Sequence, residues 1–219
     1  MKIFLDTAEV DIIKHYVPTG LIDGVTTNPS LLSKVGGQSL EVVKQIIQAL
    51  PHGDISVEIT YKEPEAVYTQ ARAIAALGDN VLVKIPCHQQ YYPIIHKLVQ
   101  DGMRLNITLI FSLSQALMMC KLGVEYISLI VGRLDDVNSD GIAVANDIAM
   151  MLNQYGFETQ LLLASIRSVV RAQDAILTGA DAMTIAPAIF EAIMKHSLTD
   201  RGIAAFDADW QKLGVKQFP

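Results

Sequence analysis

The chain has 219 residues, a length that suits one domain with a single large core. Hydrophobic residues make up 51% of it and aromatic residues only 6%, a balance that favours an aliphatic core, as in parallel α/β proteins. The formal net charge of −6 argues against nucleic acid or an anionic membrane surface as a partner.

The cysteines and the apolar stretches indicate the cellular compartment of the protein. Cys87 and Cys120 have neither metal-site nor redox-motif spacing, and we interpret them as free thiols in a reducing compartment. The first ten residues, MKIFLDTAEV, reach Asp6 before an apolar targeting region can form. The most apolar later stretch, residues 175–194, is interrupted by Asp181 and Pro187, so we expect no membrane span there. These features predict a soluble, cytoplasmic protein.

Short apolar runs alternate with longer helical patterns along the chain. The runs are rich in Val, Ile, Leu and Thr, as expected of parallel strands buried on both faces, and lie at residues 2–6, 24–28, 55–60, 81–86, 104–111, 126–131, 159–165 and 182–187. Several helical patterns end at a glycine, and one begins with a proline. We expect helices over residues 31–49 (with Ser30 as the cap), 64–77, 89–101, 112–122, 140–155, 167–178, 188–196 and 199–213.

Eight strand–helix units in a chain of this length predict an α/β fold, a (β/α)8 TIM barrel with an additional C-terminal helix. We expect residues 1–219 to form this single domain. An open doubly wound sheet is the alternative. It would be expected to carry a glycine-rich phosphate loop after an early strand, and the sequence has none.

Polar residues occur near the C-terminal ends of the predicted strands, where the eight loops of a barrel converge and chemistry takes place. For any single residue, a local hydrogen bond to the backbone is the simpler interpretation. That interpretation does not explain why polar residues recur at matching strand ends. We therefore predict a common site at the barrel mouth, formed by Asp6, Thr26, Asn28, Glu58, Lys84, Asn106, Thr108, Ser128 and Ser165.

Lys84, between Val83 and Ile85 in a predicted strand, is the most informative of these residues. Its side chain either extends outward between the helices or faces the barrel interior, where loss of water disfavours the ammonium form. A neutral amine can attack a carbonyl and form an imine, and Asp6 and Glu58 could supply the proton transfers that this chemistry needs. The two carboxylates could instead be plain ion-pair partners of Lys84. That alternative explains the charges but not the neighbouring hydroxyls and amides.

Two arginines, Arg133 and Arg167, follow the predicted sixth and seventh strands. Alone, each is better explained as a solvated surface charge. Together with Ser165 they resemble a clamp for a phosphate group, which the planar fork of arginine binds well. The five histidines are scattered without paired spacing, so we predict no metal site and expect no cofactor. Cys87 lies near the mouth, but no base is positioned in the sequence to activate its thiol.

A specific combination of motifs covers the chain essentially from end to end. GVTTNPS and VKIP are followed in order by ITLIFS and VGR, within the segments FLDTA, DGVTTNPSLLSK, VEIT, VKIP, NITLIFS, VGRLDD, NSDG, YGFET, LLASIR, LTDRGI and DADW. In these segments the chain resembles the small transaldolases and the closely related fructose-6-phosphate aldolases. The resemblance implies an enzyme of the pentose phosphate pathway that moves a dihydroxyacetone unit between sugar phosphates.

The resemblance also implies catalytic roles at matching positions. Lys84 matches the Schiff-base lysine, and Asp6 matches the carboxylate that handles the substrate hydroxyl proton during carbon–carbon cleavage. Glu58 and Thr108 match the pair that holds and activates a catalytic water.

The remaining site residues are assigned to substrate binding. Two asparagines match amides that orient the dihydroxyacetone unit, a serine lies beside them, and two arginines with a second serine match the phosphate site. The predicted substrate-binding residues are Thr26, Asn28, Asn106, Ser128, Arg133, Ser165 and Arg167.

Family members bind no metal and often assemble as decamers, with the C-terminal helix packed on a neighbouring subunit. The resemblance therefore implies a homo-oligomer, a decamer or pentamer, with the helix over about residues 199–213 in contact with a second copy. Trp210 gives that helix an apolar anchor, although packing on its own barrel explains this residue equally well.

Two positions separate the activities within the family. Glu58 points to transaldolase, because the aldolases tend to carry glutamine there. Ile130 departs from both groups, which usually have a ring at this position: phenylalanine in transaldolases and tyrosine in the aldolases. We favour a transaldolase, with an aldolase that releases free dihydroxyacetone as the alternative. A non-catalytic sugar-phosphate binder on the same barrel is a third hypothesis, against which the retained Asp6, Glu58 and Lys84 argue.

Overall fold

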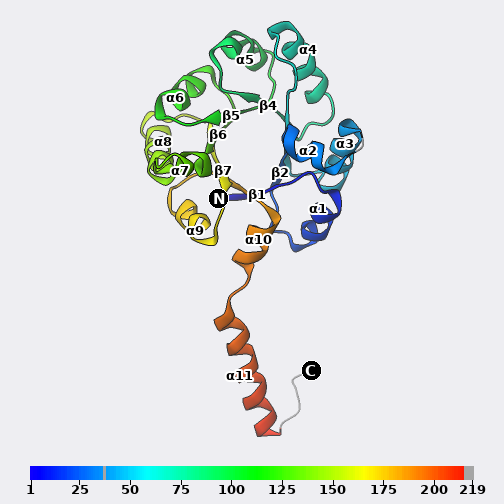
Figure 1. The fold of residues 1–219 in the computed structure, drawn as a ribbon, viewed down its shortest axis with the longest axis vertical. Helices are drawn as coiled ribbons and strands as arrows, with labels where there is room; N and C mark the ends of the chain where they lie inside the picture. Colours follow the sequence, from blue (N-terminus) through cyan, green and yellow to red (C-terminus); the bar gives the residue numbers. More distant parts are fainter. Residues whose placement is uncertain (37, 215–219) are drawn as a thin grey trace.

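The computed structural model describes residues 1–36 and 38–214. Its eight strands form a closed parallel barrel in the order β1 to β8, with β8 paired to β1 (Figure 1). The strands are β1 Lys2–Asp6, β2 Gly24–Thr26, β3 Asp54–Glu58, β4 Val81–Pro86, β5 Leu105–Ile110, β6 Tyr126–Ile130, β7 Gln160–Ile166 and β8 Ala182–Ile185. The predicted (β/α)8 barrel is confirmed, and so are the positions of all eight predicted strands to within a few residues.

Helices surround the barrel. They are α1 Val10–Tyr16, α2 Pro29–Val35, α3 Ser39–Ala49, α4 Pro64–Ala75, α5 Tyr92–Gln100, α6 Leu113–Leu122, α7 Val131–Asp136, α8 Gly141–Tyr155, α9 Val169–Leu177, α10 Pro187–Met194 and α11 Ser197–Leu213, with 3-10 turns η1 Val17–Thr19 and η2 Gln89–Tyr91. The sequence did not indicate α1 or α7, because neither seven nor six residues can display a helical period clearly.

The prediction of one helix over residues 31–49 with Ser30 as its cap was wrong. The segment forms two helices, α2 and α3, and α2 ends before Gly36. Asn28 caps α2, since its Oδ1 accepts a hydrogen bond of 2.9 Å from the backbone N–H of Leu31 and the following proline suits the first helical position. The cap fixes the Asn28 side chain where the second strand opens toward the barrel mouth.

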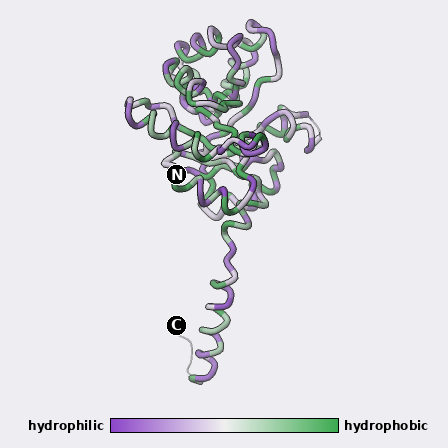
Figure 2. The backbone as a smooth tube through the Cα atoms, turned by 60° about the vertical axis from the view of Figure 1, so that its left-hand side comes forward, coloured by the Kyte–Doolittle hydropathy of each residue, from purple (hydrophilic) through white to green (hydrophobic). Residues whose placement is uncertain are grey.

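The C-terminal helix α11 stands away from the barrel (Figure 1), and Figure 2 shows both hydrophobic and hydrophilic residues along it. No residue of α11 is buried. Ile203, Phe206 and Leu213 are 55%, 75% and 69% exposed, and their spacing puts them on one face of the helix. No helix among residues 1–36 and 38–214 is both long and apolar enough to cross a membrane.

Side chains that alternate along the strands fill the barrel interior in tiers. The middle tier is a small apolar cluster, separate from the larger core between strands and helices, and consists of Phe4, Leu82, Tyr126, Leu162 and Ala182. Two positions further along the same strands are Asp6, Lys84, Ser128, Ala164 and Thr184. The strand period of two therefore puts the Lys84 side chain inside the barrel, directly above this apolar tier, which forms the floor of the barrel mouth.

Gly24 on β2 makes room for this floor. A Cβ atom at this position would lie 2.8 Å from the Phe4 ring and 2.5 Å from the backbone oxygen of Asp54. Both separations are shorter than van der Waals contact, so only glycine lets the Phe4 ring fill the centre of the barrel.

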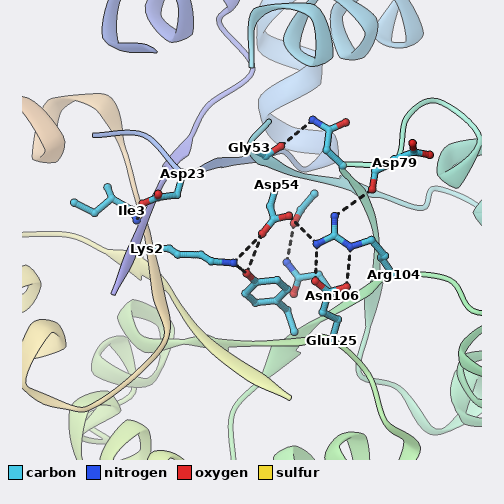
Figure 3. A network of polar contacts seen from close by, with 12 residues as sticks. Lys2, Ile3, Asp23, Gly53, Asp54, Asp79, Arg104, Asn106 and Glu125 are labelled. Atoms are coloured by element: carbon cyan, nitrogen blue, oxygen red, sulfur yellow. Dashed lines mark hydrogen bonds and ion pairs between the residues drawn. The ribbon is translucent and has the colours of Figure 1, made fainter. Parts of the chain in front are cut away.

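A polar network closes the N-terminal end of the barrel beneath the apolar tier (Figure 3). The carboxylate of Asp54 accepts hydrogen bonds from Arg104 Nη2 at 2.7 Å, from the Tyr126 hydroxyl at 2.9 Å and from Lys2 Nζ at 3.2 Å. Arg104 also donates to both oxygens of Glu125, at 2.8 and 2.5 Å. Burial alone would raise the pKa of the Asp54 carboxyl, but the bonds and charge of Arg104, with Tyr126 and Lys2, hold that pKa below its ordinary value.

Replacing Asp54 with asparagine is expected to lower the free energy of unfolding by about 2–4 kcal/mol, because Arg104 and Lys2 would lose their shared counter-charge. A lowered folded-state pKa contributes stability above the ordinary value of 3.8 and loses it as the pH falls through the folded pKa. The parent protein should therefore lose stability as the pH falls below about 3.8, and the stability of the variant should depend less on pH in this range. Urea unfolding at several pH values measures both effects.

Asp79→Asn is the matched control, because Asp79 meets Arg104 through its backbone carbonyl oxygen. This variant should unfold like the parent. Equal stability of Asp54→Asn and the parent at neutral pH would show that the network contributes nothing.

Candidate active site

A cavity of about 330 Å³ opens at the C-terminal ends of the strands, the end at which TIM-barrel enzymes carry their chemistry. This volume suits a small ligand. The predicted site residues that line it are Asp6, Thr26, Asn28, Glu58, Lys84, Thr108, Ser128, Arg133 and Ser165. Two predicted residues, Asn106 and Arg167, are not part of its wall.

Lys84 reaches the cavity from β4 and is 8% exposed. Its Nζ lies 3.1 Å from Glu58 Oε2 and donates a hydrogen bond of 3.1 Å to the backbone oxygen of Thr27. Glu58 and Lys84 are register partners on β3 and β4, so adjacent strands bring the two groups together without a loop. The outward orientation considered for Lys84 is excluded.

Asp6 ends β1 on the opposite side of the mouth from β4 and β5 in the strand order. Thr26 Oγ1 donates a hydrogen bond of 2.9 Å to Asp6 Oδ1. Burial raises the pKa of the Asp6 carboxyl above its ordinary value, while the Thr26 hydrogen bond and the charges of Lys84 and Lys34 oppose the rise. A carboxyl with a raised pKa in a cavity is suited to accept and return a proton.

Asn106 lies beneath the cavity and is fully buried. Its Nδ2 donates to Ser56 Oγ at 2.9 Å, and its Oδ1 accepts a hydrogen bond of 2.6 Å from Ser128 Oγ. The structure therefore makes Asn106 a support for Ser128, which lines the cavity, across the neighbouring strands β5 and β6. Ser56, on β3, completes this chain and was not among the predicted site residues.

Two strained residues interrupt the strand period at the cavity. Leu109 has φ +57° and Ser165 has φ +61°, a region that non-glycine residues rarely adopt. Each lies where the pairing register of its strand shifts, in β5 and in β7. As a result, consecutive residues face the cavity in each strand: Thr108 with Leu109, and Ala164 with Ser165.

The predicted phosphate clamp is only partly assembled at the cavity wall. Arg133, on α7, lines the cavity together with Ser165. Arg167 follows β7 and instead forms an ion pair with Asp136 of α7, and this guanidinium holds the pKa of the Asp136 carboxyl below its ordinary value. A Cβ on Gly132 would lie 2.3 Å from the Ser165 backbone oxygen and 2.8 Å from Arg167 Nε, so glycine permits α7 to approach both residues.

Thr184 is a cavity residue that the sequence reasoning missed. It lies on β8, is 2% exposed, and its Oγ1 is 2.6 Å from Thr26 Oγ1. The available signal was its position as the single polar side chain in the predicted strand AMTIAP. Ile130 also lines the cavity, at the end of β6.

The cysteines and histidines lie outside this arrangement. Cys87 and Cys120 are free and buried, and burial raises the pKa of both thiols, which disfavours the reactive thiolate. Within the described ranges, no group of three or more His, Cys, Asp or Glu side chains is placed to hold a metal ion. The chemistry of the cavity groups is that of an amine flanked by carboxylates, hydroxyls and an arginine.

Comparison with known protein families matches residues 3–216 to the transaldolase/fructose-6-phosphate aldolase family. The chain belongs to this family. The match spans the barrel and the whole of the C-terminal helix α11, so it covers every residue of the cavity wall. The predicted resemblance is thereby confirmed, and the protein is an enzyme of this family.

Curated relatives agree over the full length. The chain is 45% identical to a probable transaldolase of Dehalococcoides mccartyi over 97% of this chain and 99% of that protein. It is 44% identical to one of Maricaulis maris, over 98% of each, and 41% identical to one of Lactiplantibacillus plantarum, over 99% of this chain and 100% of that protein.

Among solved structures, the barrel resembles that of a double mutant of flavocytochrome b2 with sulfite bound, with a TM-score of 0.63. The identity is 11%, and the similarity covers 85% of this chain but only 56% of that longer protein. A likeness at this identity reflects the shared barrel architecture alone.

Proposed function

We propose that the protein is a transaldolase that transfers a dihydroxyacetone unit from fructose 6-phosphate or sedoheptulose 7-phosphate to an aldose phosphate through a Schiff base on Lys84. The observation that carries the proposal is the buried Lys84 amine, 3.1 Å from Glu58, in a cavity that Asp6 also lines. An amine in this setting has a carboxylate partner for proton exchange and little competing water. Family membership supports the same reaction class.

The proposed reaction begins at the ketose C2 carbonyl. Lys84 Nζ adds to this carbon, and loss of water gives the imine. We propose that Glu58 and Thr108 hold the water that leaves and later returns. Glu58 contacts Lys84 Nζ, and Thr108 lines the cavity from the strand next to β4. Asp6 takes the C4 hydroxyl proton as the C3–C4 bond breaks, and an aldehyde phosphate departs.

The three-carbon fragment remains on Lys84 as an enamine, with the nitrogen acting as electron sink. It adds to the aldehyde carbon of the acceptor, Asp6 returns its proton to the new hydroxyl, and hydrolysis of the imine releases the product ketose. Asn28, whose Oδ1 is engaged as a helix cap, retains its Nδ2 as a donor for the fragment, and Thr26 and Ser128 line the same wall. No cofactor takes part in this scheme.

Arg133 and Ser165 are proposed to bind the substrate phosphate, with Arg167 joining them when the ligand competes with Asp136 for its guanidinium. The guanidinium of Arg167 already binds the carboxylate of Asp136, so it is accessible to an anion. Asn106 acts through Ser128 and does not contact the substrate directly in this scheme.

Incubation with fructose 6-phosphate and erythrose 4-phosphate tests the proposal. Sedoheptulose 7-phosphate and glyceraldehyde 3-phosphate are expected in equal amounts, as measured by liquid chromatography and mass spectrometry. Absence of transfer at high enzyme concentration would refute a transaldolase.

Ile130 favours the alternative, a fructose-6-phosphate aldolase. This aliphatic side chain lines the cavity where the family usually has a ring, and a less enclosed enamine would be more open to water. Mixing dihydroxyacetone with glyceraldehyde 3-phosphate should then give fructose 6-phosphate. Lack of condensation would count against the aldolase.

We further propose a homo-oligomer, a decamer or pentamer, in which α11 of one copy packs on a neighbouring copy, each chain being one domain. The exposed face of Ile203, Phe206 and Leu213 supports it, because an isolated helix with an apolar face gains stability from packing. Replacing Ile203 and Phe206 together with serine is expected to lower the molecular mass in light scattering to that of smaller assemblies. Asp207→Asn, on the same helix, is the control, and a monomeric parent would contradict the proposal.

We place the enzyme in the cytoplasm and in the pentose phosphate pathway. The two free cysteines support a reducing compartment, and the proposed substrates are those of this pathway. Detection of the protein mainly in a secreted or membrane fraction of its cells would contradict the placement.

A further inference from the structure

Two buried threonines form a hydrogen-bonded chain that ends on Asp6. Thr26 Oγ1 lies 2.9 Å from Asp6 Oδ1 and 2.6 Å from Thr184 Oγ1. Both threonines are 2% exposed. They come from β2 and β8, the two strands that flank β1 in the barrel, so their hydroxyls meet across the strand that carries Asp6.

The register puts Thr184 below the carboxylate. Asp6 pairs with Thr26 between β1 and β2, whereas Thr184 pairs with Phe4 between β8 and β1, two residues before Asp6. In the strand register Thr184 therefore lies beside Phe4 of the apolar tier, two residues before Asp6. It reaches Asp6 through Thr26, because Thr26 is the residue bonded to the carboxylate.

The number of available protons fixes which hydroxyl donates in each of these hydrogen bonds. A threonine hydroxyl has one proton to donate and lone pairs to accept. An ionised Asp6 can only accept, so the Thr26 proton is committed to Asp6 Oδ1. The 2.6 Å contact must then use the proton of Thr184, and the order is Thr184 to Thr26 to Asp6. If Asp6 takes up a proton on Oδ1, it can donate to Thr26 instead, and the order of the hydrogen bonds would then reverse.

We propose that Thr184 is a positioning residue for Asp6, whose carboxylate it orients and stabilises through the Thr26 hydroxyl. This inference rests on the proposed function, in which Asp6 accepts and returns the C4 hydroxyl proton. A donor behind Thr26 polarises its hydroxyl and strengthens the bond to the carboxylate. It also gives the Thr26 hydroxyl a second partner, which favours the orientation that donates to Asp6.

The surroundings of Asp6 make this second donor effective. Burial raises the pKa of the carboxyl, and the opposing groups are the Thr26 hydroxyl and the charges of Lys84 on β4 and Lys34 on α2. Glu58 on β3 pairs with Lys84 and so offsets part of that positive charge at Asp6. The hydroxyl chain thus supplies stabilisation that does not depend on the Lys84–Glu58 pair.

Thr184→Val and Thr184→Ser in the full chain test the inference. Valine keeps the shape of threonine and removes the hydroxyl, whereas serine keeps the hydroxyl. Titration of the Asp6 carboxyl carbon, followed by carbon-13 NMR and assigned with Asp6→Asn, is expected to show the pKa rising by about 0.3–1 unit in Thr184→Val. Thr184→Ser should titrate close to the parent.

Kinetics provide a second readout. In Thr184→Val, kcat is expected to fall by about 3- to 10-fold, and the acidic limb of the pH–kcat profile should move upward with the Asp6 pKa. KM should change by less than about 2-fold, because the substrate contacts are retained. Thr184→Ser should restore kcat.

Thr178→Val is the matched control. Thr178 is also buried, and its hydroxyl bonds to the Ala175 backbone oxygen at the end of α9. It should lower stability without moving the Asp6 titration or the pH profile.

An unchanged Asp6 titration in Thr184→Val, or a serine variant that behaves like the valine variant, would overturn the inference. The NMR titration needs no substrate. Its failure is therefore distinct from failure of the proposed function, which would appear in the parent as absence of transfer and of a borohydride-trapped adduct on Lys84.

Discussion

Replacing Lys84 with methionine is expected to reduce the transfer rate by roughly 10⁴- to 10⁶-fold, because no other lysine amine lines the cavity among residues 1–36 and 38–214. Methionine approximates the length of the lysine stem and fills the same space above the apolar floor. Borohydride reduction in the presence of fructose 6-phosphate should attach a three-carbon adduct to Lys84 in the parent and none in the variant. Peptide mass mapping identifies the modified residue.

Lys44→Met provides the control, since Lys44 is an exposed residue of α3, and it should retain both transfer and the adduct. Removing Lys84 also leaves Glu58 without its ion-pair partner, so circular dichroism must show that the variant is folded. An adduct on a lysine other than Lys84 in the parent would overturn the site assignment. Substrate binding that persists in Lys84→Met, with a parent that does not turn over, would instead support the non-catalytic binder.

Replacing Asp6 with asparagine is expected to lower kcat by about 10²- to 10⁴-fold while raising stability. The amide cannot accept the C4 hydroxyl proton, although its oxygen can still accept the hydrogen bond from Thr26. Borohydride should still trap an adduct on Lys84 in this variant, but as the uncleaved six-carbon imine of fructose 6-phosphate, because imine formation precedes the cleavage step. Steady-state kinetics and trapping on the same sample separate the two steps.

The stability gain follows from the sign of the pKa shift. Burial raises the pKa of Asp6 above its ordinary value of 3.8, so the folded protein binds this proton more tightly than the unfolded chain. This tighter proton binding adds to the free energy of unfolding in full at pH values below the ordinary pKa of Asp6. The added stability is lost as the pH rises through the pKa of Asp6 in the folded protein. At neutral pH the ionised group therefore lowers stability, and Asp6→Asn should raise Tm by roughly 1–4 °C. Asp11→Asn, at an exposed carboxylate of α1, should change neither activity nor Tm, and a lower Tm in Asp6→Asn would contradict the expected sign.

Much of the site was predictable because parallel strands carry a simple geometric rule. Side chains alternate at a period of two, and the C-terminal ends of all eight strands meet at one mouth. Asp6, Glu58, Lys84 and Thr108 each lie near such an end, so their side chains converge once the strands are in register. The rule does not give rotamers. It therefore could not show that Asn106 accepts a hydrogen bond from Ser128 or that Arg167 pairs with Asp136.

Sequence patterns could not predict the short helices or the strand irregularities. The helix α7 has six residues, too few for a period, yet it carries Arg133 into the cavity wall. Ser165 faces the cavity beside Ala164 only because a positive φ interrupts β7. Such strain is maintained by the surrounding barrel, and nothing local in LLASIR indicates it.

The sequence by itself determined the number and order of the strands, the place of Lys84 within the fourth strand and the family, since each follows from local apolar runs, their spacing and motif order. Only the tertiary structure decided which polar groups touch. Thr26 and Thr184 are 158 residues apart in the chain, and their contact exists because closure of the barrel brings β8 beside β1. Contacts of this kind depend on the relative positions of distant strands to within a fraction of an ångström, and composition and periodicity contain no information at that scale.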